Sequence, residues 1–339
     1  MNVAVLGAGP GAFALSACLS LKDYDVRLYE LPEYLANIEQ LSVGQAISID
    51  GYVKGIAALS LVTTDLRAAV EGADFVFIVT HAAAHRLLAD RLAPLLRDGQ
   101  IVVLLPGYVA GGISFEKELK KVRPALDVNI LESSVLPFAC RKTSSCSVFV
   151  GGWKSDFLLS AKDTAVEVPP LADLFGPMPF SPKRLETGLN ETNFIIHPCI
   201  SLLNVGRVEG RQDWAFYREG LTPAIGRLIE EADGERLALM AKLGFAQTSI
   251  AQWLVRFYGH QGAKGETAYE ILKNYDYFSG SKGPTALAHR YFSEDVPYGL
   301  VPLAALGHAH GVPMPVVEML VDLAGRICGV DYRAIGRKP

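Results

Sequence analysis

The stretch VAVLGAGPGAFALSACLSL, residues 3–21, decides the fold of the first half of this chain. A short aliphatic run leads into the pattern Gly7-x-Gly9-x-x-Ala12, and a helical pattern follows at once. Gly7 permits a tight turn, Gly9 lets backbone N–H groups approach a pyrophosphate, and the small Ala12 lets the helix pack closely on the strand. The stretch therefore predicts a strand, a phosphate-binding turn and a helix.

The next predicted strand, residues 25–30, completes this fingerprint. It ends on Glu30, about 20 residues after the glycine pattern, where an acid accepts hydrogen bonds from the adenosine ribose and repels a 2′-phosphate. Pro10 and Gly11 begin the helix, whose N-terminus faces the two phosphates with its partial positive charge. We therefore predict an NAD-binding fold in which NADP is less favoured, although Arg27 on the same strand could soften that exclusion.

Short β-branched runs alternate with helical patterns through the rest of the first half. Such alternation predicts βαβ units and a doubly wound, mainly parallel sheet that is buried on both faces. The expected strands are residues 2–8, 25–30, 75–80, 100–106 and 128–134, and the expected helices lie near 11–22, 32–41, 82–96 and 113–122. Short strands are expected to continue through SSCSVFVGGWKSD (144–156) and DTAVEVPPL (163–171).

The apolar spacing becomes helical from about residue 185. The clearest examples are the stretches 191–206, 222–244, 249–259 and 314–329. We predict an N-terminal Rossmann domain over residues 1–183 and an all-helical domain over 184–339. Residues 259–292 are only weakly periodic and are predicted to be a loop over a site.

Composition excludes several classes of function. The 339 residues carry 32 Lys and Arg against 36 Asp and Glu, a net charge of −4 that provides no field for binding nucleic acid. The apolar runs, such as residues 73–79, are too short to cross a membrane. The five scattered cysteines and the strand pattern at residues 2–6, which leaves no room for a signal peptide, predict a cytoplasmic protein.

Other strand ends are expected to line the cofactor crevice, because ligands of open α/β sheets bind at the carboxyl ends of strands. Thr80 and His81 follow one strand, and Gly107 follows another. Two interpretations of His81 stay open, contact with the nicotinamide ribose or a role as a helix cap. His85 is predicted to lie at the surface.

Three residues of the second half attract a chemical interpretation. His197 lies in the otherwise apolar stretch NFIIHPCISLLN, and Arg290 and Asp295 are five residues apart before an apolar helix. An arginine fork matches the two oxygens of a carboxylate. An aspartate beside a histidine raises the pKa of the ring and fixes its orientation, as acid–base chemistry near neutral pH requires.

The motifs GAGPGA, LPGYVAGG, ESSVLPFACR, NETNFIIHP and HRYFSEDVPYGLVP occur in this order along the chain. Together they resemble the opine dehydrogenase family, which includes the octopine and N-(1-D-carboxyethyl)-L-norvaline dehydrogenases, over nearly the whole chain. The resemblance implies that the amine of an L-amino acid condenses with the carbonyl of a 2-oxo acid, and that NADH reduces the resulting imine. A homodimer is compatible with this interpretation.

The resemblance also assigns roles to residues. It implies that His197 is the general acid, with Asp295 as its carboxylate partner, that Arg290 holds a substrate carboxylate and that Asn193 helps to order the site. Glu132 would hold the substrate ammonium, and its alternative role is a helix or turn cap. Both substrates are expected between the two domains.

Two rival interpretations remain. A 2-hydroxyacid or 3-hydroxyacid dehydrogenase, or a reductase of ketopantoate or glycerol-phosphate type, is expected to carry a lysine in the second-domain helix, where this chain has histidine. An NAD-binding redox sensor would not need His197, Arg290 and Asp295 together. No metal site is expected, because the pair His308 and His310 has no accompanying carboxylate or cysteine cluster.

Overall fold

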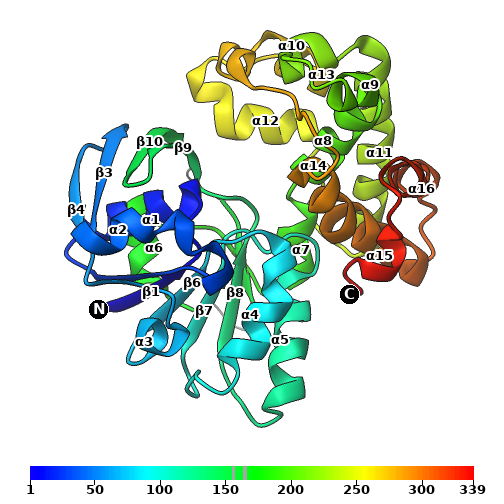
Figure 1. The fold of residues 1–339 in the computed structure, drawn as a ribbon. Coiled ribbons are helices and arrows are strands. Elements are labelled where there is room, and N and C mark those ends of the chain that lie inside the picture. Colours follow the sequence, from blue (N-terminus) through cyan, green and yellow to red (C-terminus); the bar gives the residue numbers. More distant parts are fainter. Residues whose placement is uncertain (155–156, 163–165) are drawn as a thin grey trace. The chain divides into compact units, whose positions relative to one another are not determined.

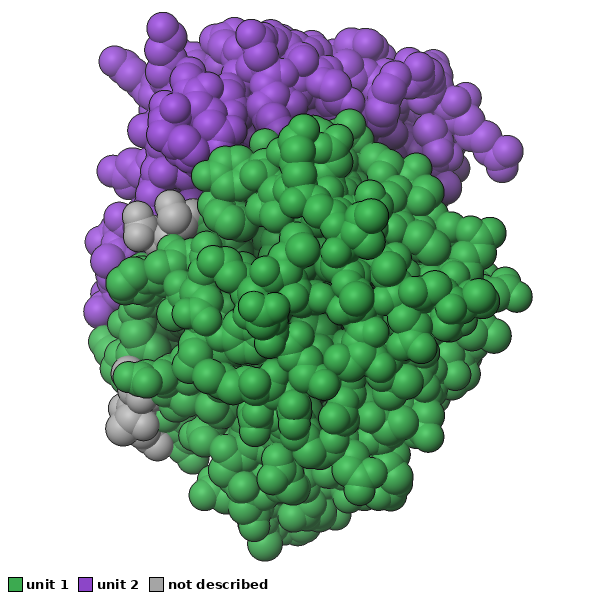
Figure 2. Space-filling model, turned by 90° about the vertical axis from the view of Figure 1, so that its left-hand side faces the viewer, with its two compact units in different colours: residues 1–188 green, residues 189–339 purple. Residues whose placement is uncertain are grey.

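The computed structural model describes residues 1–154, 157–162 and 166–339. The chain forms two compact units, residues 1–188 and residues 189–339, which Figure 2 distinguishes by colour. The expected boundary followed residue 183. None of the helices in the described ranges is long and apolar enough to span a membrane.

The first unit is built on an eight-stranded sheet. Six parallel strands form its main part, in the order β8-β7-β6-β1-β2-β5: β8 (Asn129–Ser133), β7 (Ile101–Leu104), β6 (Phe75–Ile78), β1 (Asn2–Leu6), β2 (Asp25–Tyr29) and β5 (Leu61–Thr63). β11 (Leu159–Ala161) pairs antiparallel with β8, and β12 (Phe180–Ser181) forms the edge. The predicted doubly wound, mainly parallel sheet is therefore confirmed.

Helices cover both faces of this sheet, as the continuous apolar runs of its strands require. On one face, α3 (Leu66–Val70), α4 (His85–Leu92) and α5 (Gly111–Val122) pack on the sheet around a fully buried core. On the other face lies α1 (Pro10–Ser20), which has nine buried residues (Figure 1). Those residues face the sheet on one side and a second layer of strands on the other.

Of that second layer, only the strand expected within residues 144–156 was predicted, and β10 (Ser147–Trp153) confirms it. The four strands of the layer follow the order β4-β3-β10-β9: β4 (Gly55–Ala58), β3 (Ala46–Gly51), β10 and β9 (Phe138–Ser144). Two short elements, η1 (Pro32–Asn37) and α2 (Glu39–Gly44), replace the single helix expected over 32–41. The expected strand over 163–171 is also wrong where it is described, because α6 (Pro169–Phe175) begins there, while residues 163–165 and 155–156 lie outside the described residues.

The second unit is helical, as predicted. Helix α8 (Asn193–Leu202) packs against α11 (Pro223–Lys242) and α16 (Pro315–Cys328). The remaining α-helices from residue 184 onward are α7 (Arg184–Leu189), which crosses from the first unit, α9 (Val205–Glu209), α10 (Phe216–Gly220), α12 (Ile250–Tyr258), α13 (Ala268–Asn274), α14 (Arg290–Ser293), α15 (Val301–His310) and α17 (Tyr332–Ile335).

The stretch 259–292 is not the loop that its weak periodicity predicted. It contains the 3₁₀ turns η3 (Gly259–Gln261) and η4 (Asp276–Gly280) and the helix α13 between them. Thr267 and Glu270 form a capping box at the start of α13, in which each side chain accepts a hydrogen bond from the backbone of the other. The capping box favours a helix here even though the apolar residues show little helical periodicity.

A buried ion pair fixes the middle of the helical unit. Arg236 is fully buried on α11 and donates to Asp233 one turn earlier, at 2.6 and 2.8 Å. The same guanidinium donates to the carbonyls of Leu189 and Thr248, and Asp233 accepts from the backbone N–H of Ile250. These hydrogen bonds pair the buried charges of Arg236 and Asp233. They also hold Leu189, Thr248 and Ile250, which lie in neighbouring segments, to α11.

Candidate active site

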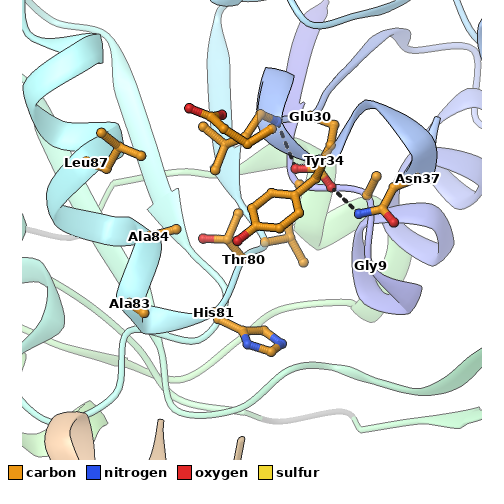
Figure 3. Close-up of a pocket in the computed structure, with 14 residues that line it drawn as sticks. Gly9, Glu30, Tyr34, Asn37, Thr80, His81, Ala83, Ala84 and Leu87 are labelled. Atoms are coloured by element: carbon orange, nitrogen blue, oxygen red, sulfur yellow. Dashed lines mark hydrogen bonds between the residues drawn. The ribbon is translucent and has the colours of Figure 1, made fainter. Parts of the chain in front are cut away.

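A pocket of about 590 Å³ lies in the first unit where the order of the parallel strands reverses. Its walls are Gly7–Gly9 after β1, the segment from Glu30 to Asn37 after β2, and Val79–His81 after β6, together with Ala83, Ala84 and Leu87 (Figure 3). The carboxyl ends of β1 and β6 are therefore neighbours. This is the switch point at which doubly wound sheets bind their ligands.

The glycine turn has the geometry that a pyrophosphate requires. Gly7 adopts φ +113°, and a Cβ there would meet the carbonyl oxygen of Val79 at 2.5 Å, so another residue would strain the turn. At Gly9 a Cβ would meet no atom within 4 Å, which keeps the space beside the helix open. Pro10 occupies the first turn of α1, Gly11 packs under Leu136, and Ala12 is fully buried. The residues present thus fit a dinucleotide.

Glu30 lies one residue beyond β2, which ends at Tyr29, and its side chain faces the pocket. Its two carboxylate oxygens accept from the backbone N–H of Leu31 at 2.8 Å and from the amide of Asn37 at 3.0 Å (Figure 3). These bonds fix the carboxylate while leaving each oxygen the capacity to accept again.

Arg27 does not contribute to this pocket. Its guanidinium donates to the carbonyls of Glu71, at 2.5 Å, and Ala68, at 3.4 Å, at the C-terminal end of α3, and its Nε lies 3.5 Å from a carboxylate oxygen of Asp25. The arginine therefore neutralises a helix C-terminus. Arg27 therefore supplies no cation to the pocket that Glu30 lines.

Of the residues that follow β6, some line the pocket and one is buried in the core. Thr80 and His81 line the pocket, and His81 precedes the 3₁₀ turn η2 (Ala82–Ala84) without capping it through its side chain. His85 was predicted at the surface, and this is wrong: it is 3% exposed and its ring packs edge-on against Phe115. The reason is that His85 begins α4 on the side that faces α5.

Glu132 lies on β8 and is fully buried. One carboxylate oxygen accepts from the backbone N–H of Gly112 at 2.7 Å, in the first turn of α5, where a negative charge is favoured. Gly107 supplies the space for this acid, because a Cβ there would lie 2.2 Å from the same oxygen. Gly107 thus accommodates Glu132, and the pocket beside Gly7 is formed by other residues.

The second unit brings His197 and Asp295 together, although 98 residues separate them. Nδ1 of His197 lies 2.8 Å from Oδ2 of Asp295, His197 is 5% exposed, and Asp295 is fully buried. His197 projects from α8, and Asp295 precedes η5 (Val296–Leu300), a turn of π-helix of the kind often found at functional sites. The pair has the geometry of an acid–base histidine oriented by a carboxylate.

Burial lowers the pKa of His197 below its ordinary value. The carboxylate of Asp295 acts in the opposite direction, as predicted, but desolvation is the larger effect. Arg290 also lowers the pKa and Glu294 raises it. Because the lowering effects exceed the raising ones, the protonated imidazole of His197 releases its proton more readily than an ordinary histidine does.

Arg290 and Asn193 are the other two predicted site residues of this unit. The guanidinium of Arg290 is partly exposed, and its Nη1 lies 3.7 Å from a carboxylate oxygen of Glu294. Asn193 is the first residue of α8, where its backbone N–H donates to Glu191, and it precedes His197 by one helical turn. Side chains four residues apart share a face of a helix, so Asn193 lies on the same side of α8 as the imidazole.

Three residues near these sites were not identified from the sequence. Tyr34 and Asn37 line the pocket of the first unit, and the ring of Tyr291 covers His197. Asn37 follows Glu30 by seven residues, and only the fold of η1 returns it to the carboxylate. No pattern in the sequence could have revealed such pairs. Among the described residues, no group of three or more His, Cys, Asp or Glu side chains could hold a metal ion.

Comparison with known proteins shows which of them this chain resembles. Residues 181–328 match the family described as NAD/NADP octopine/nopaline dehydrogenase, alpha-helical domain. The opine dehydrogenase of Arthrobacter sp. (strain 1C) is 33% identical over 98% of this chain and 92% of its own. The octopine dehydrogenase of Mizuhopecten yessoensis is 26% identical over 99% of this chain and 92% of its own.

Solved structures agree with the fold. An octopine dehydrogenase determined with NADH and L-arginine superimposes with a TM-score of 0.79 at 23% identity, covering 97% of this chain and 90% of that one. The two-unit architecture, the helical-domain match and the identity to the Arthrobacter enzyme along almost the entire length agree with one another. The chain belongs to the opine dehydrogenase family.

Proposed function

We propose that this protein joins the amine of an L-amino acid to the carbonyl carbon of a 2-oxo acid of the pyruvate class and reduces the resulting imine to a secondary amine. The observation that carries the proposal is the buried contact of 2.8 Å between His197 and Asp295 in the helical unit. A dinucleotide-binding fold alone does not identify the reaction that a protein catalyses. A histidine that is hydrogen-bonded to a carboxylate can donate the proton that the reductive condensation consumes.

The proton balance assigns the task of His197. Condensation of an ammonium group with a carbonyl, followed by reduction, takes up one hydride and one proton and releases water. NADH supplies the hydride when bound. Protonated His197 donates from Nε2 to the departing hydroxyl of the carbinolamine, while Asp295 holds Nδ1 and stabilises the charge on the ring.

Charged groups in the two units suit the two substrates. Arg290 presents a partly exposed guanidinium close enough to His197 to affect its pKa, and we assign it to a substrate carboxylate. Asn193, one turn before His197 on α8, helps to order the same site. We assign Glu132 to the substrate ammonium because it lies at the end of a parallel strand. The alternative role as a helix cap stays open, and the hydrogen bond from Gly112 in the first turn of α5 favours it.

The cofactor assignment rests on the pocket of the first unit. The turn Gly7–Gly9 and the N-terminus of α1 would hold the pyrophosphate, and Glu30 would accept from the adenosine ribose hydroxyls. Thr80 and His81 at the end of β6 would lie along the rest of the dinucleotide. Of the two interpretations of His81, we favour the contact with the cofactor, because the side chain caps no helix.

Replacement of Glu30 tests the cofactor assignment. Glu30→Ser should weaken NADH binding by about tenfold, because a hydrogen bond to a charged acceptor contributes about 1.5–3 kcal/mol. It should weaken NADPH binding less, since the repulsion of a 2′-phosphate is lost as well. Titration of NADH fluorescence measures both affinities. Glu39→Ser, an exposed acid on α2, is the control; equal losses for NADH and NADPH in Glu30→Ser would contradict the assignment.

A co-substrate requirement tests the reaction itself. NADH absorbance should stay constant with pyruvate alone and fall when any suitable member of a panel of L-amino acids is added. Oxidation with the 2-oxo acid alone would instead indicate a hydroxyacid dehydrogenase. No oxidation under any combination would favour an NAD-binding sensor.

We also propose a cytoplasmic location. All five cysteines are free, two of them buried, as is usual in a reducing compartment.

A further inference from the structure

The imidazole of His197 is covered on one face by the ring of Tyr291. The two ring centroids are 4.0 Å apart and the planes are inclined by 26°, so the rings are stacked. Phe216 meets the same imidazole at a steep angle, with its centroid at 5.9 Å. His197 is thus held by two aromatic rings in addition to the hydrogen bond of Nδ1 to Asp295.

Tyr291 is itself firmly placed. Its backbone N–H donates to Nδ1 of His289, which caps α14, and the ring of His289 meets the tyrosine ring edge-on at 4.4 Å. The ring of Phe216 also contacts the tyrosine ring, with the two centroids 4.8 Å apart and the planes tilted. Burial raises the pKa of Tyr291 to about 12, so the phenol is neutral wherever His197 titrates. A fixed, uncharged ring face is therefore presented to the imidazole.

Several other groups act on His197, and they oppose one another. Burial and the guanidinium of Arg290, on α14, disfavour the protonated ring, whereas two carboxylates just before η5 favour it. Two more titratable groups lie near Tyr291 itself: the phenol of Tyr217 on α10, which stays neutral, and the ring of His289. The charged groups that face His197 are Asp295, Glu294 and Arg290. In this balance a modest contribution from a stacked ring changes the protonated fraction.

We propose that Tyr291 is a positioning residue for the reaction: its ring face fixes the plane of the imidazole against Asp295 and stabilises the protonated ring. An aromatic face attracts a cation placed over it, and the attraction grows when water is excluded, as it is at this buried ring. A stack also removes rotation about the imidazole's own bond to the chain, so Nε2 keeps one direction. The role depends on the ring and not on the hydroxyl, and it rests on the proposed function of His197.

Titration of His197 measures this role without substrate or cofactor. The imidazole signals of the protein carrying ¹³C-labelled histidine are followed by NMR against pH, and the His197 signal is the one missing in His197→Asn. In Tyr291→Phe the midpoint should match that of the unaltered protein. In Tyr291→Leu it should move to lower pH, and kcat for condensation at neutral pH should fall by about tenfold while the NADH Kd stays within twofold.

A matched control and a second variant keep the test decisive. Tyr277→Leu removes an exposed tyrosine that stacks on Tyr258 and Tyr275, and it should leave the midpoint unchanged. If Tyr291→Leu does not fold, Tyr291→Met fills the same space without a ring face. An unchanged midpoint and kcat in these variants, or an equal loss in Tyr291→Phe, would overturn the proposal. A shifted midpoint in a protein without condensation activity would refute the proposed function and leave the role of the ring intact.

Discussion

His197→Asn lowers kcat for the condensation by about a thousandfold or more and leaves the Kd for NADH within twofold. General acid catalysis by a positioned histidine contributes about 10²–10⁴-fold, and His197 is the group that Asp295 orients. The dinucleotide pocket belongs to residues 1–188, so its affinity does not depend on this ring. Asparagine is preferred to alanine because its amide can still donate to the buried Asp295. Steady-state kinetics and NADH fluorescence give the two values.

Circular dichroism and thermal unfolding provide the control for this variant, since the helical unit must remain folded. Val255→Ala on α12, which removes an exposed apolar side chain, serves as a neutral comparison within the same unit. A His197→Asn protein that is folded, binds NADH and retains more than a tenth of the original kcat would contradict the assigned role. A protein that fails to fold would return His197 to a structural role.

Asp295→Asn lowers kcat by about a hundredfold or more and moves the pH profile to lower pH. The carboxylate of Asp295 opposes the effect of burial on the pKa of His197, so its removal lowers that pKa further. Condensation needs the protonated ring: activity is present below the pKa and is lost as pH rises through it, and in the variant this loss begins at lower pH. Oxidation of the product needs the neutral ring, so its acid limb moves to lower pH as well.

The pH dependence can therefore be measured in both directions of the reaction, and the two results should agree. Profiles of kcat/KM against pH for condensation and for oxidation should shift in the same sense in Asp295→Asn. Glu294→Gln, at the adjacent position, also removes a carboxylate that raises the pKa of His197, and it should produce the smaller shift. A shift to higher pH in Asp295→Asn would show that the carboxylate does not stabilise the charged ring.

Local patterns in the sequence predicted the first unit well. The positions of Gly7, Gly9 and Ala12 fix a turn whose backbone geometry is nearly independent of the rest of the chain, and Glu30 follows at the spacing that one βαβ unit dictates. The helical character of residues 189–339 was likewise apparent from apolar periodicity. Both features depend on interactions within about 30 residues.

Apart from the strand expected within residues 144–156, the second sheet was missed because its pairing is distant and its strands are ambiguous. Ser48 of β3 lies beside Ser147 of β10, 99 residues away, and both strands mix polar with apolar side chains. Burial of His85 depends in the same way on Phe115, in another helix. By contrast, α13 could have been predicted, because the capping box of Thr267 and Glu270 is visible in the sequence.

The candidate site shows the same division. His197 and Asp295 were paired through the resemblance to a family, and the structure places their side chains in contact. The sign of the net effect on the pKa of His197 was not predictable, since it depends on how completely the ring is removed from water. The stack with Tyr291 also required coordinates, because nothing in the residue spacing indicates which ring covers the imidazole.

The identity of the product tests the central claim most directly. The protein is incubated with a 2-oxo acid, an L-amino acid and NADH that carries deuterium at the transferred position, and the products are analysed by mass spectrometry. A secondary amine that contains both carbon skeletons, with one deuterium on the carbon derived from the oxo group, is the predicted result. A deuterated 2-hydroxy acid with the amino acid left unchanged would contradict the account.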